Sequence, residues 1–119
     1  MAGSQGAACP DPRLRILTPL DRQSYIAGAT LEIIGTADYP GARRYQVESR
    51  SGGTSEWSLI DRNRRTTRLG MLAEWDTAEL PPGEYEIRLS PVDLNNIRLA
   101  NASPCLITVN LLPVEAGQP

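Results

Sequence analysis

Apolar and polar residues alternate in several short runs of this sequence, a spacing typical of β-strands with one buried face. In the run 44–50, Tyr45 and Val47 share one face, and the polar residues between and beside them share the other. The run 85–89 repeats the arrangement with three apolar residues on one face. Helical periodicity does not extend beyond about two turns anywhere in the chain, so the pattern predicts an all-β protein.

Turn-forming residues divide the chain into seven expected strands. Prolines and glycines mark the divisions, most strongly at 81–83, where the sequence reads Pro-Pro-Gly. We expect strands at 14–18, 30–37, 44–50, 56–60, 69–77, 85–89 and 105–112. The segment 21–28 is expected to be a turn-rich bridge, and 61–67 a polar connection. This spacing predicts a two-layer sandwich, and the connections are too short for helical crossovers.

The segment LPPGEYEIRL at 80–89 resembles the L-x-P-G-x-Y-x-x-x-L signature of fibronectin-III and related sandwiches. In that signature the tyrosine ring fills the edge of the core and its hydroxyl binds a backbone group of the preceding loop. The resemblance gives this role to Tyr85. It also implies the fold class: an all-β, seven-stranded antiparallel immunoglobulin-like or fibronectin-III-like sandwich.

A longer series of short motifs resembles immunoglobulin-like modules appended to exported and cell-envelope proteins of bacteria such as the Chloroflexota, including the C-terminal tails of some penicillin-binding proteins. The motifs are CPDP at 9–12, ILTP at 16–19, IGTA at 34–37, YQVE at 45–48, GMLAEWDT at 70–77, LPPG at 80–83 and SPC at 103–105. The resemblance implies a non-catalytic module that is a spacer, or an accessory subunit of a larger envelope assembly. Such a module works through protein–protein contacts and not as an enzyme.

The expected domain organisation is one sandwich at 9–112 between two flexible tails, 1–8 and 113–119. Both tails are small, polar and rich in glycine or proline. The first eight residues lack the basic and apolar regions of a signal peptide, so we expect the chain to be a segment of a longer exported protein. No apolar run approaches the roughly 20 residues of a membrane span.

The amino-acid composition limits the catalytic and binding groups that the chain can supply. The chain has no histidine, which removes the commonest general base and metal ligand, and we predict no catalytic residue, metal site or cofactor. The formal net charge of −2 argues against nucleic acid as a partner. All 12 cationic residues are arginine, which fits either genome composition or a warm habitat.

Cys9 and Cys105 are the only cysteines. The first and last strands of a sandwich usually run side by side, so we expect these residues to form a disulfide. Such a bond implies an oxidising, extracytoplasmic compartment. Two alternatives stay open: a pair of unpaired buried thiols, and a lipid-modified or intermolecular Cys9.

The aromatic residues have two interpretations. We expect most of them in the core, because a chain without phenylalanine needs its large rings for packing. The predicted core residues are Tyr45, Trp75, Tyr85, Ile87 and Leu89. The alternative function is carbohydrate binding, with Tyr25 and Trp57 as an exposed stacking platform.

Two further sets of residues are candidate binding sites. Arg62, Arg64, Arg65 and Arg68 form either a contact for an acidic partner or a solvated loop that keeps an edge strand from pairing with neighbours. A group of acidic and amide residues is a weaker candidate for a calcium site at a loop end, although their spacing matches no known loop. They are Asp61, Asp76, Asp93, Asn95 and Asn96.

Overall fold

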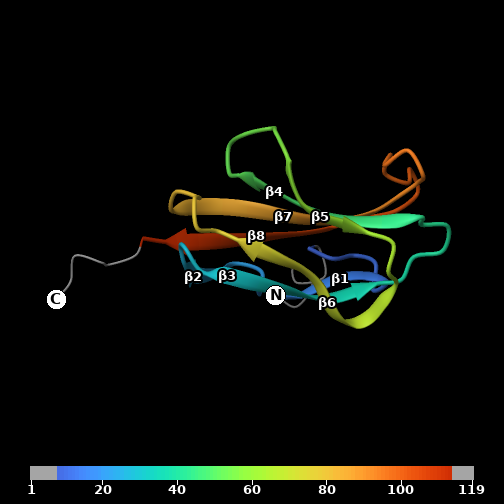
Figure 1. The fold of residues 1–119 in the computed structure, drawn as a ribbon, viewed down its shortest axis with the longest axis horizontal. Helices are drawn as coiled ribbons and strands as arrows, with labels where there is room; N and C mark the ends of the chain where they lie inside the picture. The colour runs from blue at the N-terminus through green and yellow to red at the C-terminus, as the bar shows by residue number, and fades with distance from the viewer. Residues whose placement is uncertain (1–7, 114–119) are drawn as a thin grey trace.

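The computed structural model describes residues 8–113, which form two β-sheets packed face to face (Figure 1). The expected tails fall outside the described residues, apart from Ala8 and Pro113. The strands are β1 Leu14–Thr18, β2 Gln23–Ile26, β3 Thr30–Ala37, β4 Arg44–Ser51, β5 Ser58–Asn63, β6 Thr67–Asp76, β7 Gly83–Val92 and β8 Cys105–Leu112.

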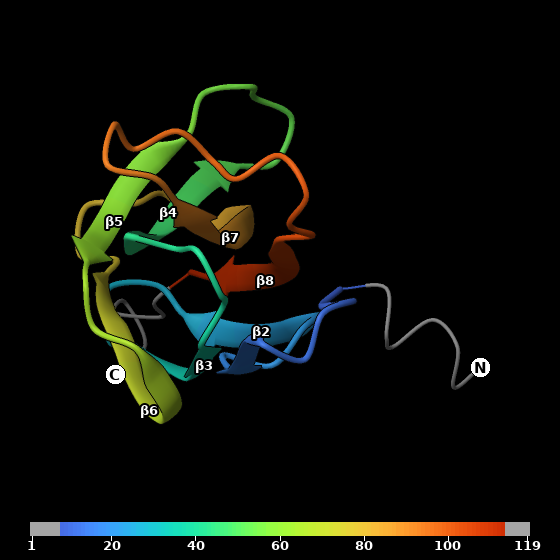
Figure 2. The same cartoon turned by 90° about the vertical axis from the view of Figure 1, so that its right-hand side faces the viewer.

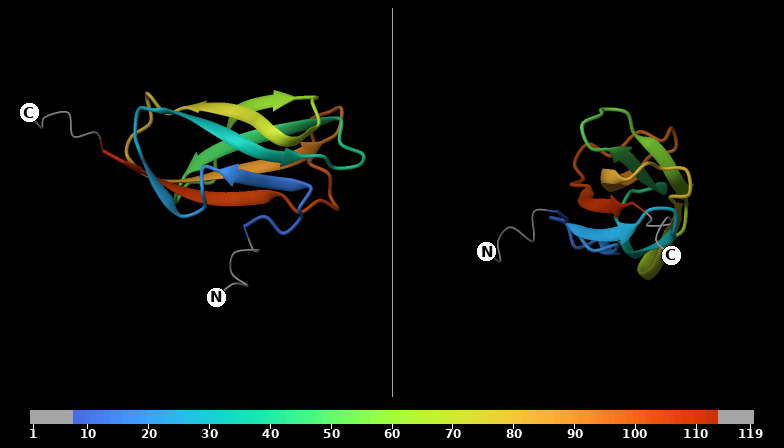
Figure 3. Two further views of the ribbon diagram at one scale, coloured as in Figure 1. Left: turned by 90° about the horizontal axis from the view of Figure 1, so that it is seen from below. Right: turned by 90° about the vertical axis from the view of Figure 1, so that its left-hand side faces the viewer.

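One sheet has three strands in the order β1-β3-β6, and the other has five in the order β2-β8-β7-β4-β5. Figure 2 looks along the strands and shows the two layers facing each other. In the left view of Figure 3, β1 lies next to β8, although the two strands belong to different sheets. The all-β, two-layer prediction is therefore confirmed.

The expected number of strands and the expected antiparallel pairing are both wrong, and both errors arise from β2. The segment 21–28 was expected to be a bridge, but within it Gln23–Ile26 forms an eighth strand. This strand pairs with β8 in parallel, from Gln23 opposite Val109 to Ile26 opposite Leu112, so the five-stranded sheet is mixed rather than antiparallel. The physical reason is that β2 buries no alternating face. Its backbone becomes a strand by hydrogen bonding to the free edge of β8.

The inward faces of both sheets form one hydrophobic core. All five predicted core residues are buried: Tyr45, Trp75, Tyr85, Ile87 and Leu89. The rings of Trp75 and Tyr85 meet edge to face, with centroids 5.8 Å apart and planes at 71°. The Tyr85 hydroxyl donates a hydrogen bond to the carbonyl of Pro81 at 2.7 Å, and burial raises the pKa of Tyr85. The largest fully buried aliphatic side chains come from both sheets: Leu14, Ile33, Ile87, Leu89, Ile107 and Leu111.

Gly35 on β3 allows β1 to approach closely, and this suggests a paired test. A methyl group at Gly35 would overlap the backbone carbonyl of Arg15, whereas at Gly70, its partner on β6, it would meet only the Thr67 methyl at 3.3 Å. Because overpacking against backbone typically destabilises by about 1–3 kcal/mol, we expect Gly35→Ala to lower the free energy of unfolding by at least that much. Gly70→Ala should stay within about 1 kcal/mol of the wild type. Equal losses in urea denaturation would contradict the close approach of β1.

Candidate functional site

The segment that precedes β1 is fastened to the beginning of β8. Cys9 and Cys105 form a disulfide, as predicted. Next to it, the backbone N–H of Leu106 donates to the carbonyl of Ala8 at 2.7 Å. The N–H of Ile16 on β1 approaches the Cys105 sulfur at 3.3 Å. We call this end of the sandwich the disulfide end. The β3–β4, β5–β6 and β7–β8 loops lie there, because β4 and β8 begin at this end and β3, β5 and β7 finish there.

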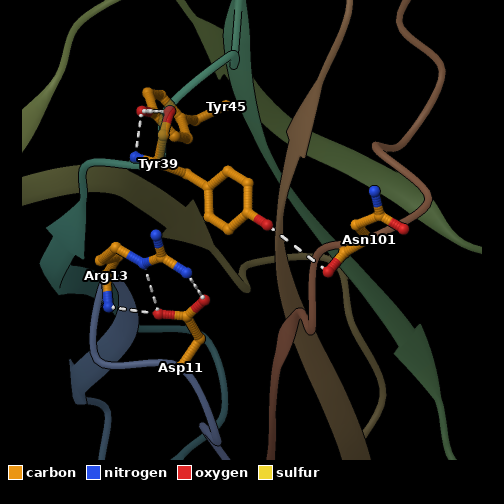
Figure 4. Close-up of polar contacts among 5 residues, drawn as sticks. All are labelled: Asp11, Arg13, Tyr39, Tyr45 and Asn101. Carbon is orange, nitrogen blue, oxygen red and sulfur yellow. Dashed lines mark hydrogen bonds and ion pairs between the residues drawn. The ribbon is translucent and has the colours of Figure 1, made fainter.

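A polar cluster at the disulfide end joins three segments that are distant in the sequence (Figure 4). The Arg13 guanidinium donates to both Asp11 carboxylate oxygens, at 2.9 and 2.8 Å, and lies 4.6 Å from the centroid of the Tyr39 ring. The Tyr39 hydroxyl donates to the carbonyl of Asn101 at 3.4 Å, and its backbone N–H donates to the Tyr45 hydroxyl at 2.7 Å. Tyr39 thus connects the N-terminal segment to the β3–β4 and β7–β8 loops.

The ion pair in this cluster shifts the pKa of both partners. The side-chain hydrogen bond from Arg13 is the main cause of the lowered pKa of Asp11, and the same bond raises the pKa of Arg13. Asp11 therefore stays ionised at neutral pH, and burial keeps Tyr85 protonated there. Neither group gains or loses a proton near neutral pH. General acid–base catalysis needs a group that does so.

We expect the Asp11 carboxyl to titrate below its ordinary pKa of 3.8 when its chemical shift is followed by NMR. Because the folded-state pKa is depressed, the ion pair contributes stability above the unfolded pKa, and that contribution disappears as the pH falls through the folded pKa. Arg13→Gln should return the Asp11 midpoint towards its ordinary value. Arg22→Gln, which removes an exposed guanidinium elsewhere, is the control and should leave it unchanged. An Asp11 midpoint that does not respond to Arg13→Gln would show that the pair is absent in solution.

Trp57 lies over a set of charges on the outer face of the five-stranded sheet. Arg50 on β4 pairs with Glu86 on β7 at 2.6 Å, and Arg88 on β7 pairs with Glu48 on β4 at 2.8 Å. The guanidinium carbons of Arg50 and Arg88 are 4.5 and 4.0 Å from the centroid of the Trp57 ring. The ring is thus occupied by two cations of its own chain. Sequence reasoning missed this cluster, although the alternating charges at 48–50 and 86–88 were a visible signal.

Tyr25 lies at the opposite edge of the same sheet, on β2. The Trp57 ring lies over Arg50 on β4 and Arg88 on β7, whereas Tyr25 shares a depression with Glu32 and Glu74 of the three-stranded sheet. The structure therefore does not bring the two predicted platform residues together. The Tyr25 hydroxyl accepts a hydrogen bond from the Leu20 N–H at 2.8 Å. Its side chain lines an open depression of about 510 Å³, shared with Glu32 and Glu74.

Of the four arginines of the predicted cluster, two lie on strands of different sheets, and Arg64 and Arg65 lie in the loop between these strands. Arg62 lies on β5, where its Nε donates to the Gln46 side chain at 3.1 Å. Arg68 lies on β6 and pairs with Asp38 at 3.2 Å. The polar connection expected at 61–67 is mostly strand, because 61–63 belong to β5 and 67 belongs to β6. Only residues 64–66 form a loop between these strands. Arg62 and Arg68 thus lie on the edge strands of two different sheets, a position in which charged side chains hinder pairing with a neighbouring strand.

The predicted calcium candidates are not brought together. Asp93 follows β7 at the disulfide end, where its carboxylate accepts hydrogen bonds from the N–H groups of Asn95 and Ile97. Asp76 finishes β6 at the opposite end and accepts a hydrogen bond from the N–H of Ala78. Each aspartate thus organises its own turn. Within residues 8–113 there is no group of three or more histidine, cysteine or acidic residues placed to hold a metal ion.

Comparison with known proteins identifies no relative. No protein-family model, curated protein or solved structure matches the chain. In the part of the chain that the structure describes, no helix is long and apolar enough to cross a membrane. The disulfide is the feature that bears on compartment, since such bonds form and persist mainly in oxidising environments outside the cytoplasm.

Proposed function

We propose that this protein is an immunoglobulin-like or fibronectin-III-like module that serves as a rigid, non-catalytic spacer in a larger extracytoplasmic assembly. Three features support the proposal. The two-sheet strand order is compatible with such modules, Tyr85 contacts the carbonyl of Pro81 as the tyrosine of their signature does, and the disulfide fits an oxidising compartment.

The observation that carries the spacer role is the position of the two ends of the described chain. Ala8 is hydrogen-bonded to Leu106 at the beginning of β8, and Pro113 follows the last residue of the same strand. The ends therefore lie at opposite ends of one strand of 8 residues, about 25 Å apart at 3.3 Å per residue. A module built in this way holds whatever is attached to its two ends at a fixed separation.

Pulsed electron paramagnetic resonance tests the spacer directly. Spin labels attached to non-natural residues at positions 8 and 113 should give one narrow distance distribution, close to the length of β8 plus the label linkers. The distribution should not change when soluble sugars or calcium are added. A broad distribution in the oxidised protein would contradict a rigid spacer. Labels at 8 and 106 form the control pair, because these two residues are hydrogen-bonded neighbours.

The β7–β8 loop is the part of the module that we propose contacts the rest of the assembly. It exposes two large apolar side chains at the disulfide end, Leu94 at 59% and Ile97 at 61% exposure. Asp93 fixes the turn that presents them. A photo-crosslinking residue at position 94 should capture a protein partner in the native host. The same residue at position 64, in the exposed β5–β6 loop, is the control and should capture less.

Carbohydrate binding remains a second candidate function because of one observation. Tyr25 lines the open depression together with two carboxylates, Glu32 and Glu74, and small-molecule sites usually combine aromatic side chains with a few polar groups that fix the ligand. Affinity electrophoresis in gels that contain neutral polysaccharides tests it. Retardation that is abolished by Tyr25→Ala and kept in Trp57→Ala would support this function, and unretarded wild-type protein would exclude it for those sugars.

A further inference from the structure

We propose that the Cys9–Cys105 disulfide gives this module a further function: it transmits tension from one end to the other through β8 without lengthening. The inference deepens the proposed spacer role and rests on it for its biological use. The mechanical property itself follows from where the bond lies in the chain. It requires no ligand and no conformational change.

The covalent path between the two described ends is short. It runs from Ala8 to Cys9, crosses the disulfide to Cys105, and follows β8 to Leu112 and Pro113. The cysteines are 96 residues apart in the sequence. All residues between them, which include strands β1 to β7, form a closed loop beside this path. Force applied at Ala8 and Pro113 is thus carried by the disulfide and β8, and the loop is not stretched.

Chain dimensions show how much this arrangement limits extension. A segment of 96 residues reaches roughly 320–350 Å when it is fully extended, at 3.3–3.6 Å per residue. With the disulfide closed, none of that length can be released, even when the sandwich unfolds. The residues that remain in the path are those of β8, and a β-strand already rises about 3.3 Å per residue. The oxidised module can therefore gain only a few ångströms.

The position of β8 within its sheet supports the same function. β8 lies between β2 and β7, with seven residue pairs along β7 and four along β2. These pairings hold β8 extended, so a pull between its two ends is carried by the strand's own backbone and passes no load to β2 or β7. The disulfide lies at the first residue of β8, so tension enters the strand at one end and leaves it at the other.

Single-molecule force spectroscopy on the whole 119-residue chain, held between handles at its two ends, tests the proposal. Under oxidising conditions we expect no unfolding step longer than about 30 Å, roughly the length of a strand of this size. With reductant added to the same molecules, we expect a step of about 300 Å as the released loop extends. The step expected after reduction is thus about ten times as long as the longest step expected in the oxidised protein. An oxidised molecule that lengthens by 100 Å or more would overturn the proposal.

The variant Cys9→Ser with Cys105→Ser is the matched control and should show the long step with or without reductant. If this variant does not fold, reduction of the wild type while it is held at low force gives the same comparison. The outcome is separable from that of the spacer proposal. A broad label distance in the relaxed protein contradicts the spacer, whereas a long step in the oxidised protein under load contradicts the force path.

Discussion

Opening the Cys9–Cys105 disulfide should lower the free energy of unfolding by up to about 4–5 kcal/mol. The bond closes a loop of nearly 100 residues, and chain-entropy models assign about 4.7 kcal/mol to a loop of that length. The stabilisation arises because the bond restricts the unfolded chain. Since small domains are stable by only about 5–15 kcal/mol, the reduced protein should be marginally stable. Urea denaturation with and without reductant measures the difference.

The chain offers a clean control for this experiment. Its only two cysteines are those of the disulfide, so reductant has no other target among its thiols. The variant Cys9→Ser with Cys105→Ser should reproduce the reduced wild type, and reductant should not change its midpoint further. If reduction lowered the free energy of unfolding by less than about 1 kcal/mol, the bond would lie in a part of the chain that does not unfold with the sandwich. That result would contradict its position at the first residue of β8.

The sequence predicts those parts of the fold in which each strand buries one face. The strand at 105–112 matches β8 at both ends, because its alternating apolar residues are buried one by one. The cysteine pairing was also predicted correctly, and β1 lies beside β8 as expected, although the two strands belong to different sheets. The segment before β1 lies against β8, whereas β1 itself pairs with β3 in the other sheet.

The features that the sequence did not predict depend on partners distant in the chain. β2 has no buried face of its own and is a strand only because the edge of β8 lies beside it. Trp57 was interpreted, together with Tyr25, as an exposed stacking platform. Its contacts are with Arg50 and Arg88, which are brought beneath it by the pairing of β4 with β7. Local alternation carries no information about these pairings, which are set by the tertiary fold.

Removing the Trp75 side chain should destabilise the protein by about 3–5 kcal/mol, the usual range when a buried tryptophan is replaced by alanine. Trp75 is only 3% exposed and meets Tyr85 edge to face across the core. Trp75→Ala leaves a cavity between the sheets and removes this aromatic contact, which itself contributes about 0.5–1.5 kcal/mol. Urea denaturation followed by far-ultraviolet circular dichroism measures the loss.

Trp57→Ala is the matched control, because it makes the same substitution at the only other tryptophan. There the change removes two cation–π contacts on a partly exposed face, each worth about 0.5–1 kcal/mol, so the loss should be about 1–2 kcal/mol. Fluorescence then separates the two sites. Trp57→Ala retains only the buried Trp75, whose emission should lie at shorter wavelength and shift to longer wavelength on unfolding. If Trp57→Ala destabilised the protein as much as Trp75→Ala, the core of the sandwich would not be where the inward faces of the two sheets place it.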